Sequence, residues 1–508
     1  MLSKVTSFAL NGLDGVPVEV ETDIHSGLPG YELVGLPDTA VKESRERVRS
    51  ALKNSGRRFP TQKITVNLAP ADLKKEGSYF DLAIAVGILK ATGQLAGECA
   101  GTVFLGELAL DGRLRPLAGI LPILISAKAR GYSKFVVPAG NAREAAYIGG
   151  IQTVAAESLS AVIDHISGYA PLPPVPTARY GAAAPQAGKF DLAFVKGQAV
   201  ARRALEVAVS GGHNLLLVGP PGTGKTMLAR CIPSIMPDMT FAEALEVTKI
   251  HSVAGILGEE GIVTERPFRS PHHTASTVAL CGGGNRTVKP GEISLAHHGV
   301  LFLDEMPEYH RSALEALRQP LEDGCITVSR SGGSVTFPAN FMLVASMNPC
   351  PCGNYGSADK VCTCTPSAIH RYRARVSGPL LDRIDMQVEV DSVGYEELSS
   401  AAPAESSATV KARVERARAL QRERFASCKG VRTNADMGER EMRRFCPLSR
   451  DCEDALRLSF ERLRLSARAR ARIIKVARTA ADLAGSEHIA PAHIFEAVSY
   501  RKYDNQGV

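Results

Sequence analysis

Eight residues of this 508-residue chain, GPPGTGKT at Gly219–Thr226, restrict its fold more than any other segment. They follow an apolar run, NLLLVG, that is typical of a buried strand, and they precede a helical pattern, MLARCIP. A glycine-rich loop between a strand and a helix lets backbone N–H groups surround phosphate groups. The complete G-x-x-x-x-G-K-T pattern in this setting argues against a chance glycine-rich turn. The segment therefore predicts a parallel-sheet α/β domain that binds a nucleoside triphosphate.

We expect this loop to hold ATP and Mg²⁺. The amine of Lys225 would reach the β- and γ-phosphates, and the hydroxyl of Thr226 would ligate Mg²⁺. The residues expected to contact the nucleotide are Gly219, Pro220, Pro221, Gly222, Thr223, Gly224, Lys225 and Thr226.

A second apolar run, GVLFLDE, ends in two carboxylates about 80 residues after the loop. A P-loop site needs such an acidic strand beside it. Asp304 is expected to hold the Mg²⁺ shell, and Glu305 is expected to position or polarise the attacking water. The spacing makes an accidental strand end a poor alternative.

Three further polar residues complete the predicted catalytic set. The strand-like run FMLVASMN ends at Asn348, whose amide is suited to orient water near the γ-phosphate. The segment LLDRID places Arg383 where it can reach the nucleotide of a neighbouring subunit. Arg468, at the start of the helical run SARARARIIKVARTAADL, is a candidate to contact the γ-phosphate from a helical region.

These motifs together resemble the AAA+ ATPases of the magnesium-chelatase type. The segments RPFRSPHHTAS, GGGNRTVKPGEISLAHHGVLFLDE, NPCPCG and KVARTAADL narrow the resemblance to the magnesium-chelatase-like subfamily of the competence protein ComM, also called YifB. The resemblance implies a hexameric ATPase that drives branch migration of DNA during natural transformation. It also implies that Asn348 is sensor 1, Arg383 the arginine finger and Arg468 sensor 2, with Arg470 and Arg472 as close competitors for the last role.

The resemblance and the element patterns predict an α/β fold in four segments. Residues 1–168 alternate strand-like and helical runs and resemble a Lon-protease-like α/β domain. Residues 169–189, rich in Pro, Ala and Gly, are expected to be a linker. Residues 190–395 are the expected AAA+ ATPase core with a four-cysteine insertion. Residues 396–508 carry helical patterns alone past Ser406 and are the expected helical lid.

The N-terminal domain is not expected to be a peptidase. Lon-type catalysis needs a serine nucleophile and a lysine base. In the segment KKEGSYFDLAIAVGIL, Tyr79 occupies the place of the serine and Ser78 lies one position away. Leu121 occupies the place of the lysine. A scaffold for hexamer assembly or for DNA binding is the better interpretation.

Four of the eleven cysteines, Cys350, Cys352, Cys362 and Cys364, lie within fifteen residues. Two Cys-x-Cys pairs joined by a polar turn can place four thiolates around one ion, and Zn²⁺ in a closed Cys₄ site is the expected occupant. A [4Fe–4S] cluster also takes four cysteines and remains an alternative. The histidine pairs 272–273 and 297–298 are not assigned to metal, because adjacent side chains of an extended chain point to opposite sides.

The positive charge of the chain is concentrated near its C-terminus. Residues 411–480 contain 20 Lys and Arg against 9 Asp and Glu, whereas the whole chain has a net charge of +7. A solvated helical face is the simple explanation, and binding of a polyanion is the functional one. A predicted hairpin at Gly324–Ala339, turning at Gly332–Gly333, places Arg330 at its tip as a candidate DNA contact in a ring pore. The segment Pro267–Gly291 is the second candidate pore loop.

The sequence thus favours a cytoplasmic, homo-hexameric ATPase that uses ATP, Mg²⁺ and Zn²⁺ and acts on single-stranded and branched DNA. Recombination proteins are further candidate partners. No apolar run is long enough for a membrane span, and the N-terminus lacks the pattern of a secretory signal. Two rival functions remain open at this point. One is a magnesium-chelatase motor subunit that assists metal insertion, and the other is a protein-remodelling ATPase.

Overall fold

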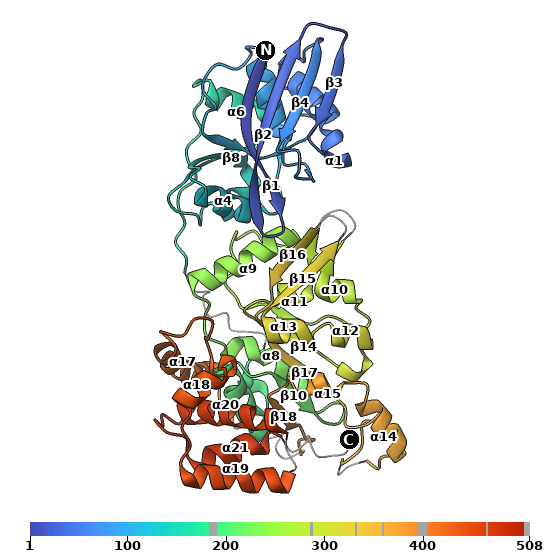
Figure 1. Cartoon of the computed structure of the whole chain (residues 1–508), viewed down its shortest axis with the longest axis vertical. Coiled ribbons are helices and arrows are strands. Elements are labelled where there is room, and N and C mark those ends of the chain that lie inside the picture. The colour runs from blue at the N-terminus through green and yellow to red at the C-terminus, as the bar shows by residue number, and fades with distance from the viewer. Residues whose placement is uncertain are drawn as a thin grey trace.

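The computed structural model describes residues 1–181, 190–284, 288–330, 333–357, 360–394, 404–463 and 466–501. An N-terminal α/β part lies at one end of the long axis of the molecule (Figure 1). A second α/β part follows it, and a helical C-terminal part lies beside the far half of that second part. This arrangement confirms the α/β fold class with a parallel-sheet core and a helical C-terminal region.

The N-terminal part is built on a seven-stranded mixed sheet in the order β3-β4-β2-β1-β5-β8-β9. Its strands β1 and β2 form a long antiparallel hairpin, and β1, β5, β8 and β9 are parallel. Helices α3 and α4 are apolar on nearly every side because they pack within the core of this part. The elements are β1 (Leu2–Asn11), β2 (Asp14–His25), β3 (Gly30–Val34), α1 (Thr39–Lys42), α2 (Ser44–Asn54), β4 (Lys63–Ala69), α3 (Asp81–Ala91), β5 (Thr102–Phe104), β6 (Glu107–Leu108), β7 (Leu114–Arg115), α4 (Ile120–Ala129), β8 (Lys134–Pro138), α5 (Ala142–Ala145), β9 (Gln152–Ala156) and α6 (Leu159–Ile166).

The middle part contains a five-stranded parallel sheet in the order β11-β14-β17-β10-β18. Strands β10, β14 and β17 are buried along their whole length, which explains why each reads as an unbroken apolar run. The elements are α7 (Ala199–Gly211), β10 (Leu215–Val218), α8 (Lys225–Ile235), α9 (Phe241–Ala254), β11 (Phe268–Arg269), α10 (Thr277–Cys281), β12 (Gly282–Gly283), β13 (Lys289–Pro290), α11 (Glu292–Leu295), β14 (Val300–Leu303), α12 (Arg311–Glu315), α13 (Arg318–Asp323), β15 (Cys325–Arg330), β16 (Gly333–Pro338), β17 (Met342–Met347), α14 (Pro366–Arg373), α15 (Gly378–Leu381) and β18 (Met386–Glu389).

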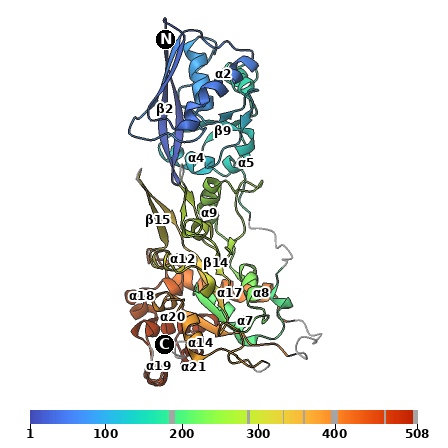
Figure 2. The same cartoon turned by 90° about the vertical axis from the view of Figure 1, so that its right-hand side faces the viewer.

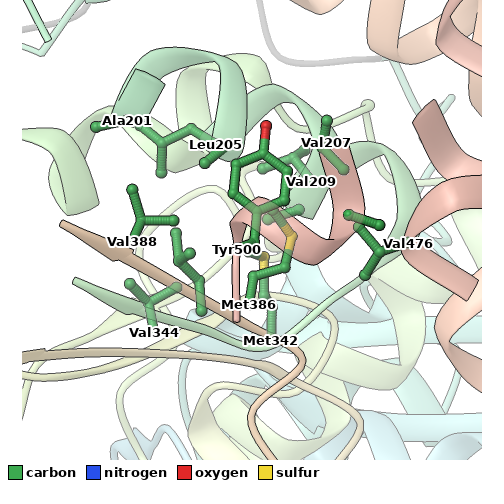
Figure 3. Packing of buried hydrophobic residues seen from close by; sticks show 14 of the residues in the cluster. Ala201, Leu205, Val207, Val209, Met342, Val344, Met386, Val388, Val476 and Tyr500 are labelled. Atoms are coloured by element: carbon green, nitrogen blue, oxygen red, sulfur yellow. The ribbon is translucent and has the colours of Figure 1, made fainter. Parts of the chain in front are cut away.

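The helical C-terminal part packs against the middle part through a shared hydrophobic core. Figure 3 shows side chains of α7, β17 and β18 meeting Val476 of the C-terminal part and the ring of Tyr500. The buried face of α20 continues into this core because its apolar residues recur at helical spacing. The helices are α17 (Ser407–Arg424), α18 (Glu439–Phe445), α19 (Arg450–Leu463), α20 (Ala467–Leu483) and α21 (Pro491–Ser499).

The N-terminal part contacts the middle part along helix α4, at Arg143 of α5 and at the turn between β1 and β2. Helix α4 packs against α9, where the backbone N–H of Gly119 donates to the carbonyl of Ser252 over 3.0 Å. The hydroxyl of Ser252 donates to the buried carboxylate of Glu144 over 2.9 Å. The turn between β1 and β2 meets the β15–β16 hairpin, and both views show these elements side by side (Figures 1 and 2). A Cβ atom at Gly12 would lie 2.6 Å from Val335 Cγ1, so only glycine fits at this contact.

Several local predictions need correction. The expected turn at Gly332–Gly333 is displaced, because Gly333 already belongs to β16 and pairs with Arg330 of β15. Gly332 lies outside the described residues. The predicted insert Pro267–Gly291 contains β11, so its first residues belong to the edge of the core sheet. Among the described residues, no helix combines the length and the low charge that crossing a membrane requires.

Candidate functional site

The phosphate-binding loop follows β10 and leads into α8. Gly222 and Gly224 have φ angles of +84° and +88°, which favour glycine, and Gly224 caps the N-terminus of α8. A Cβ atom at Gly219 would lie 2.1 Å from the carbonyl oxygen of Val390, because the loop passes directly over the end of β18. The glycines predicted from the sequence are therefore required by backbone conformation or by close packing at these positions.

Lys225 is turned into the loop. Its ammonium group donates to the carbonyl oxygens of Gly219 at 2.6 Å and Pro220 at 2.7 Å, and to Asn348 Oδ1 at 3.3 Å. Burial lowers the pKa of Lys225 to about 8, although the carboxylates of Asp304 and Glu305 act in the opposite direction. The amine thus lies within the loop and within reach of the amide predicted as sensor 1.

The acidic strand β14 delivers Asp304 to the hydroxyl of Thr226, which donates to Asp304 Oδ2 over 2.9 Å. These two oxygens are the pair predicted to face Mg²⁺, and hard oxygen ligands of this kind suit that ion. The next residue, Glu305, is exposed and has a φ angle of +52°, a left-handed conformation that turns the chain sharply after the strand. Its side chain therefore lies at the open side of the site, where water can reach it.

Ser346 is a site residue that the sequence reasoning missed. Its hydroxyl donates to Asp304 Oδ1 over 2.5 Å and accepts the backbone N–H of Glu305 at 3.1 Å. One side chain of β17 thus holds both acidic residues of β14 in place. The available signal was a single serine, Ser346, in the otherwise apolar run of the sensor strand.

A cavity of about 410 Å³ opens beside the phosphate-binding loop, a size typical of a small-ligand site. One wall is the loop itself, Pro220–Gly224. The second wall comes from the segment before α7, with Phe194 and Val195. The third wall comes from the cysteine-bearing segment, with Asn354, Ser357 and Lys360. Sequence reasoning predicted the first wall and neither of the others.

The two predicted arginines do not line this cavity. Arg383 and Arg468 both line a second cavity, of about 1010 Å³, between the middle part and the helical C-terminal part. The guanidinium of Arg383 donates to the carbonyl of Pro379 over 2.6 Å and pairs with Glu322. Arg468 pairs with Asp382, the residue before Arg383, over 3.3 Å. The structure therefore places the two arginines at the same cavity, and this cavity is separate from the one beside the phosphate-binding loop of their own chain.

The two arginines that compete with Arg468 have different surroundings. Arg470 pairs over 2.9 Å with Glu453 of α19, and it does not line the second cavity. Arg472 lines that cavity, and its side chain lies 3.4 Å from Asp385. Arg468 and Arg472, one helical turn apart, thus face the LLDRID segment, whereas Arg470 faces a neighbouring helix.

The four clustered cysteines converge. Sulfur–sulfur distances are 3.4 Å between Cys350 and Cys352, 3.7 Å between Cys350 and Cys362, and 3.6 Å between Cys352 and Cys362. All four Sγ atoms, that of Cys364 included, lie within 4.8 Å of one another. Four sulfurs about 2.3 Å from one zinc ion would be ~3.8 Å apart, so the spacing fits a tetrahedral site. The pKa of Cys352 is lowered to about 6 because the backbone N–H groups of Asn354 and Thr363 donate to its sulfur.

The histidine pair 297–298 behaves differently from the expectation. His298 has a φ angle of +57°, so the two rings lie side by side, with centroids 4.0 Å apart. Both Nε2 atoms contact Glu246 Oε2, at 3.1 Å and 2.8 Å. The reason given for excluding metal is therefore wrong, although the geometry does not favour metal either. His297 Nδ1 accepts the backbone N–H of Asn340 at 3.1 Å, which places the ring proton on Nε2, and the guanidinium of Arg432 lies 3.3 Å from His298.

The N-terminal part contains the residues that occupy, or lie next to, the places of the Lon-type serine and lysine, and each of them has an ordinary packing or hydrogen-bonding role. The Tyr79 hydroxyl donates to the carbonyl of Ala118 over 2.9 Å, and the Ser78 hydroxyl donates to the carboxylate of Glu107. Leu121 is buried in α4. Among the described residues, the contacts of these two hydroxyls are an acid and a carbonyl, and neither is the amine base that Lon-type chemistry uses.

The predicted DNA contact at the hairpin tip is only partly visible. The backbone of Arg330 ends β15, but its side chain and residues 331–332 lie outside the described residues. The hairpin lies between α13 and β17, so it connects the acidic strand to the sensor strand along the chain.

The chain matches known proteins over nearly its whole length. Residues 191–398 match the family of magnesium chelatase, subunit ChlI, and residues 404–501 match the C-terminal segment of that subunit. Residues 20–141 match a further family described as subunit ChlI of Mg-chelatase. The chain is 46% identical to the YifB protein of Escherichia coli over 99% of this chain and 97% of that protein.

Two further relatives place this match in context. The chain is 43% identical to the competence protein ComM of Haemophilus influenzae over 98% of this chain and 97% of that protein. The identity to the magnesium-chelatase 67 kDa subunit of Chlorobaculum parvum is 31%, over 30% of this chain and 22% of the subunit.

Proposed function

The chain belongs to the magnesium-chelatase-like ComM/YifB subfamily of AAA+ ATPases, and from this premise we propose that it is an ATP-driven motor on DNA. Its action would be branch migration during homologous recombination and natural transformation. The observation that carries the ATPase assignment is the convergence of Lys225, Thr226 and Asp304 with Asn348 at one edge of the core sheet. The competence role rests on the relative named for it, which matches this chain almost from end to end.

Each residue of the site has a defined task in this proposal. Lys225 would neutralise the β- and γ-phosphates, and Thr226 and Asp304 would hold Mg²⁺, which would polarise the phosphate oxygens. Glu305 orients and polarises the attacking water. Asn348 fixes the position of that water or of the γ-phosphate. Ser346 acts as a positioning residue, because it fixes the carboxylate of Asp304 and the backbone of Glu305.

We further propose a homo-hexameric ring in which Arg383 and Arg468 serve the nucleotide of the adjacent subunit. Both arginines line a cavity away from the phosphate-binding loop of their own chain, which supports action on a neighbour. In a head-to-tail ring, one face of each subunit meets a different face of the next subunit. The arginines of one subunit can then reach the nucleotide of its neighbour.

The proposal is tested by the rate of ATP hydrolysis with and without DNA. We expect single-stranded and branched DNA to raise the rate several-fold, and casein to leave it unchanged. Stimulation by casein alone would favour the protein-remodelling function. The chelatase function would be favoured by two results together. The rate of hydrolysis would respond to neither DNA nor casein, and activity would appear only when chelatase subunits and a porphyrin are added. The short alignment with the chelatase 67 kDa subunit gives that alternative less support than the end-to-end match to ComM.

Replacing Arg330 by Ala tests the hairpin as the DNA contact. An arginine at a hairpin tip can hold phosphate without reading sequence, because its guanidinium offers a fixed charge and five donors. We expect Arg330→Ala to keep basal ATP hydrolysis and to lose most branch migration on a labelled three-strand junction. Arg113→Ala, an exposed arginine of the N-terminal part, is the control. Full branch migration by Arg330→Ala would move the search to the insert at Pro267–Gly291.

The four-cysteine site gives a second test, by metal content. The sulfur spacing supports zinc, so we expect purified protein to be colourless and to contain about one zinc ion per chain. The double variant Cys352→Ser/Cys364→Ser should lose the metal, whereas Cys428→Ser, outside the cluster, should keep it. Brown protein that absorbs near ~400 nm would establish an iron–sulfur cluster instead.

A further inference from the structure

The segment between the two cysteine pairs contributes directly to the nucleotide cavity. Asn354, Ser357 and Lys360 line it together with Phe194 and Val195. All three lie between Cys352 and Cys362, so the sulfur cluster holds both ends of this segment. We call the described residues of this segment, 353–357 and 360, the cysteine-loop wall.

The cysteine-loop wall also touches the phosphate-binding loop. Gly353 has a φ angle of +81°, and a Cβ atom there would lie 2.6 Å from Cδ of Pro221. The two loops are therefore packed so closely that no side chain fits between them. A displacement of Gly353 would be transmitted directly to Pro221, which belongs to the predicted ATP-binding set.

Three contacts fix the wall near the sensor residue. The backbone N–H of Tyr355 donates to Cys350 Sγ over 3.3 Å. The guanidinium of Arg373 lies over the Tyr355 ring, 5.3 Å from its centroid, and donates to the carbonyl of Pro349 over 3.2 Å. Cys350, which is fully buried, follows Asn348 by two residues. One continuous packed unit thus contains the four-cysteine site, the amide of Asn348 and the cysteine-loop wall.

We propose that the cysteine-loop wall is part of the nucleotide-binding site, that Lys360 contacts the bound adenine nucleotide, and that the metal-loaded thiolate cluster sets nucleotide affinity by holding this wall. The proposal rests on the ATPase function proposed above and adds a binding residue and a means of regulation to it. A cation is suited to this position because the ligand of the cavity is anionic. A cluster without metal would leave the segment between Cys352 and Cys362 without its common anchor.

The first test measures nucleotide affinity by the fluorescence of a mant-labelled ADP in the absence of DNA. We expect Lys360→Ala to raise the dissociation constant about tenfold, the effect of losing one charge-assisted contact. Lys360→Arg should retain most of the affinity, and Lys53→Ala, an exposed lysine of the N-terminal part, should have no effect. A dissociation constant of Lys360→Ala within twofold of the wild-type value would remove Lys360 from the site.

The second test removes the metal. Wild-type protein treated with a zinc chelator, and the Cys352→Ser/Cys364→Ser variant, are compared with untreated protein and with Cys428→Ser. Metal content, thermal unfolding and mant-ADP affinity are measured on each sample. We expect metal-free protein that remains folded to bind mant-ADP about tenfold more weakly, and we expect added Zn²⁺ to restore the affinity of the treated wild-type protein alone.

The outcomes separate this proposal from the proposed function. Folded, metal-free protein with unchanged mant-ADP affinity would overturn the regulatory role of the cluster. This holds both for protein from which the chelator has removed the metal and for protein purified without metal. Protein that binds mant-ADP in the predicted manner but shows no DNA-stimulated hydrolysis would leave the cysteine-loop wall intact and would contradict the DNA motor. If Lys225→Ala binds mant-ADP normally, the cavity is not the nucleotide site, and both proposals fail.

Discussion

Glu305→Gln is expected to bind ATP with nearly wild-type affinity and to hydrolyse it at least ~10²-fold more slowly, as is usual when a water-activating group is lost. The carboxylate follows Asp304, the proposed Mg²⁺ ligand, and it is exposed at the open side of the site. Glutamine preserves size and hydrogen bonding but cannot take a proton from water. Lys225→Ala should instead abolish binding, because its amine is the group proposed to contact the phosphates themselves.

The measurement compares mant-ATP affinity with the rate of phosphate release in a single turnover. Glu308→Gln is a matched control, since Glu308 lies three residues further along the same segment and pairs with Arg375 over 2.8 Å. The control should hydrolyse ATP normally. Normal hydrolysis by Glu305→Gln would show that the acidic strand has been assigned to the wrong role.

Arg383→Ala is expected to lower the rate of ATP hydrolysis about 10³-fold while it leaves nucleotide affinity nearly unchanged, in line with the effect of arginine fingers. The Arg383 side chain is 12% exposed and faces the second cavity. Its Nε atom is buried, and the described residues provide no hydrogen-bond partner for it. A phosphate oxygen brought by another subunit would supply a partner for this donor once the side chain turns away from its contact with Glu322.

Mixing two inactive variants distinguishes action within a subunit from action between subunits. Lys225→Ala cannot bind the nucleotide but keeps Arg383, whereas Arg383→Ala binds the nucleotide but lacks the arginine. In a mixed ring, some interfaces pair an intact phosphate-binding loop with an intact Arg383, so part of the activity should return. Arg470→Ala is the control, because Arg470 pairs with Glu453 away from the cavity. A mixture as inactive as its components would contradict the ring arrangement.

The sequence predicted the parts of the site that depend on local chemistry. Asp304 directly follows the apolar strand β14, and Lys225 and Thr226 begin the helix that the loop after β10 leads into. Parallel strands bring their carboxyl ends to one edge, so these residues meet there. Ser346 was missed because its role depends on the exact register between β14 and β17. The third wall of the cavity was missed for a related reason, since its contact with Pro221 joins residues more than a hundred positions apart.

Backbone conformation explains why the prediction for the histidine pair 297–298 was wrong. The argument that adjacent histidines point apart assumes an extended chain, and the left-handed φ angle of His298 removes that assumption. The fold class was easier to predict, because buried strands and amphipathic helices leave periodic patterns that survive without knowledge of their neighbours. The packing of the N-terminal part on the hairpin left no such pattern.

That packing connects the N-terminal part thermodynamically to the sensor strand β17 of the middle part. The turn at Gly12 lies against Val335, and β16 leads within four residues into β17, which ends next to the sensor amide. If nucleotide binding shifts β17, the hairpin and the N-terminal part must shift with it or lose their contact. Reciprocity then fixes the size of the effect: a molecule bound to the N-terminal part changes nucleotide affinity by the same factor by which the nucleotide changes the affinity for that molecule.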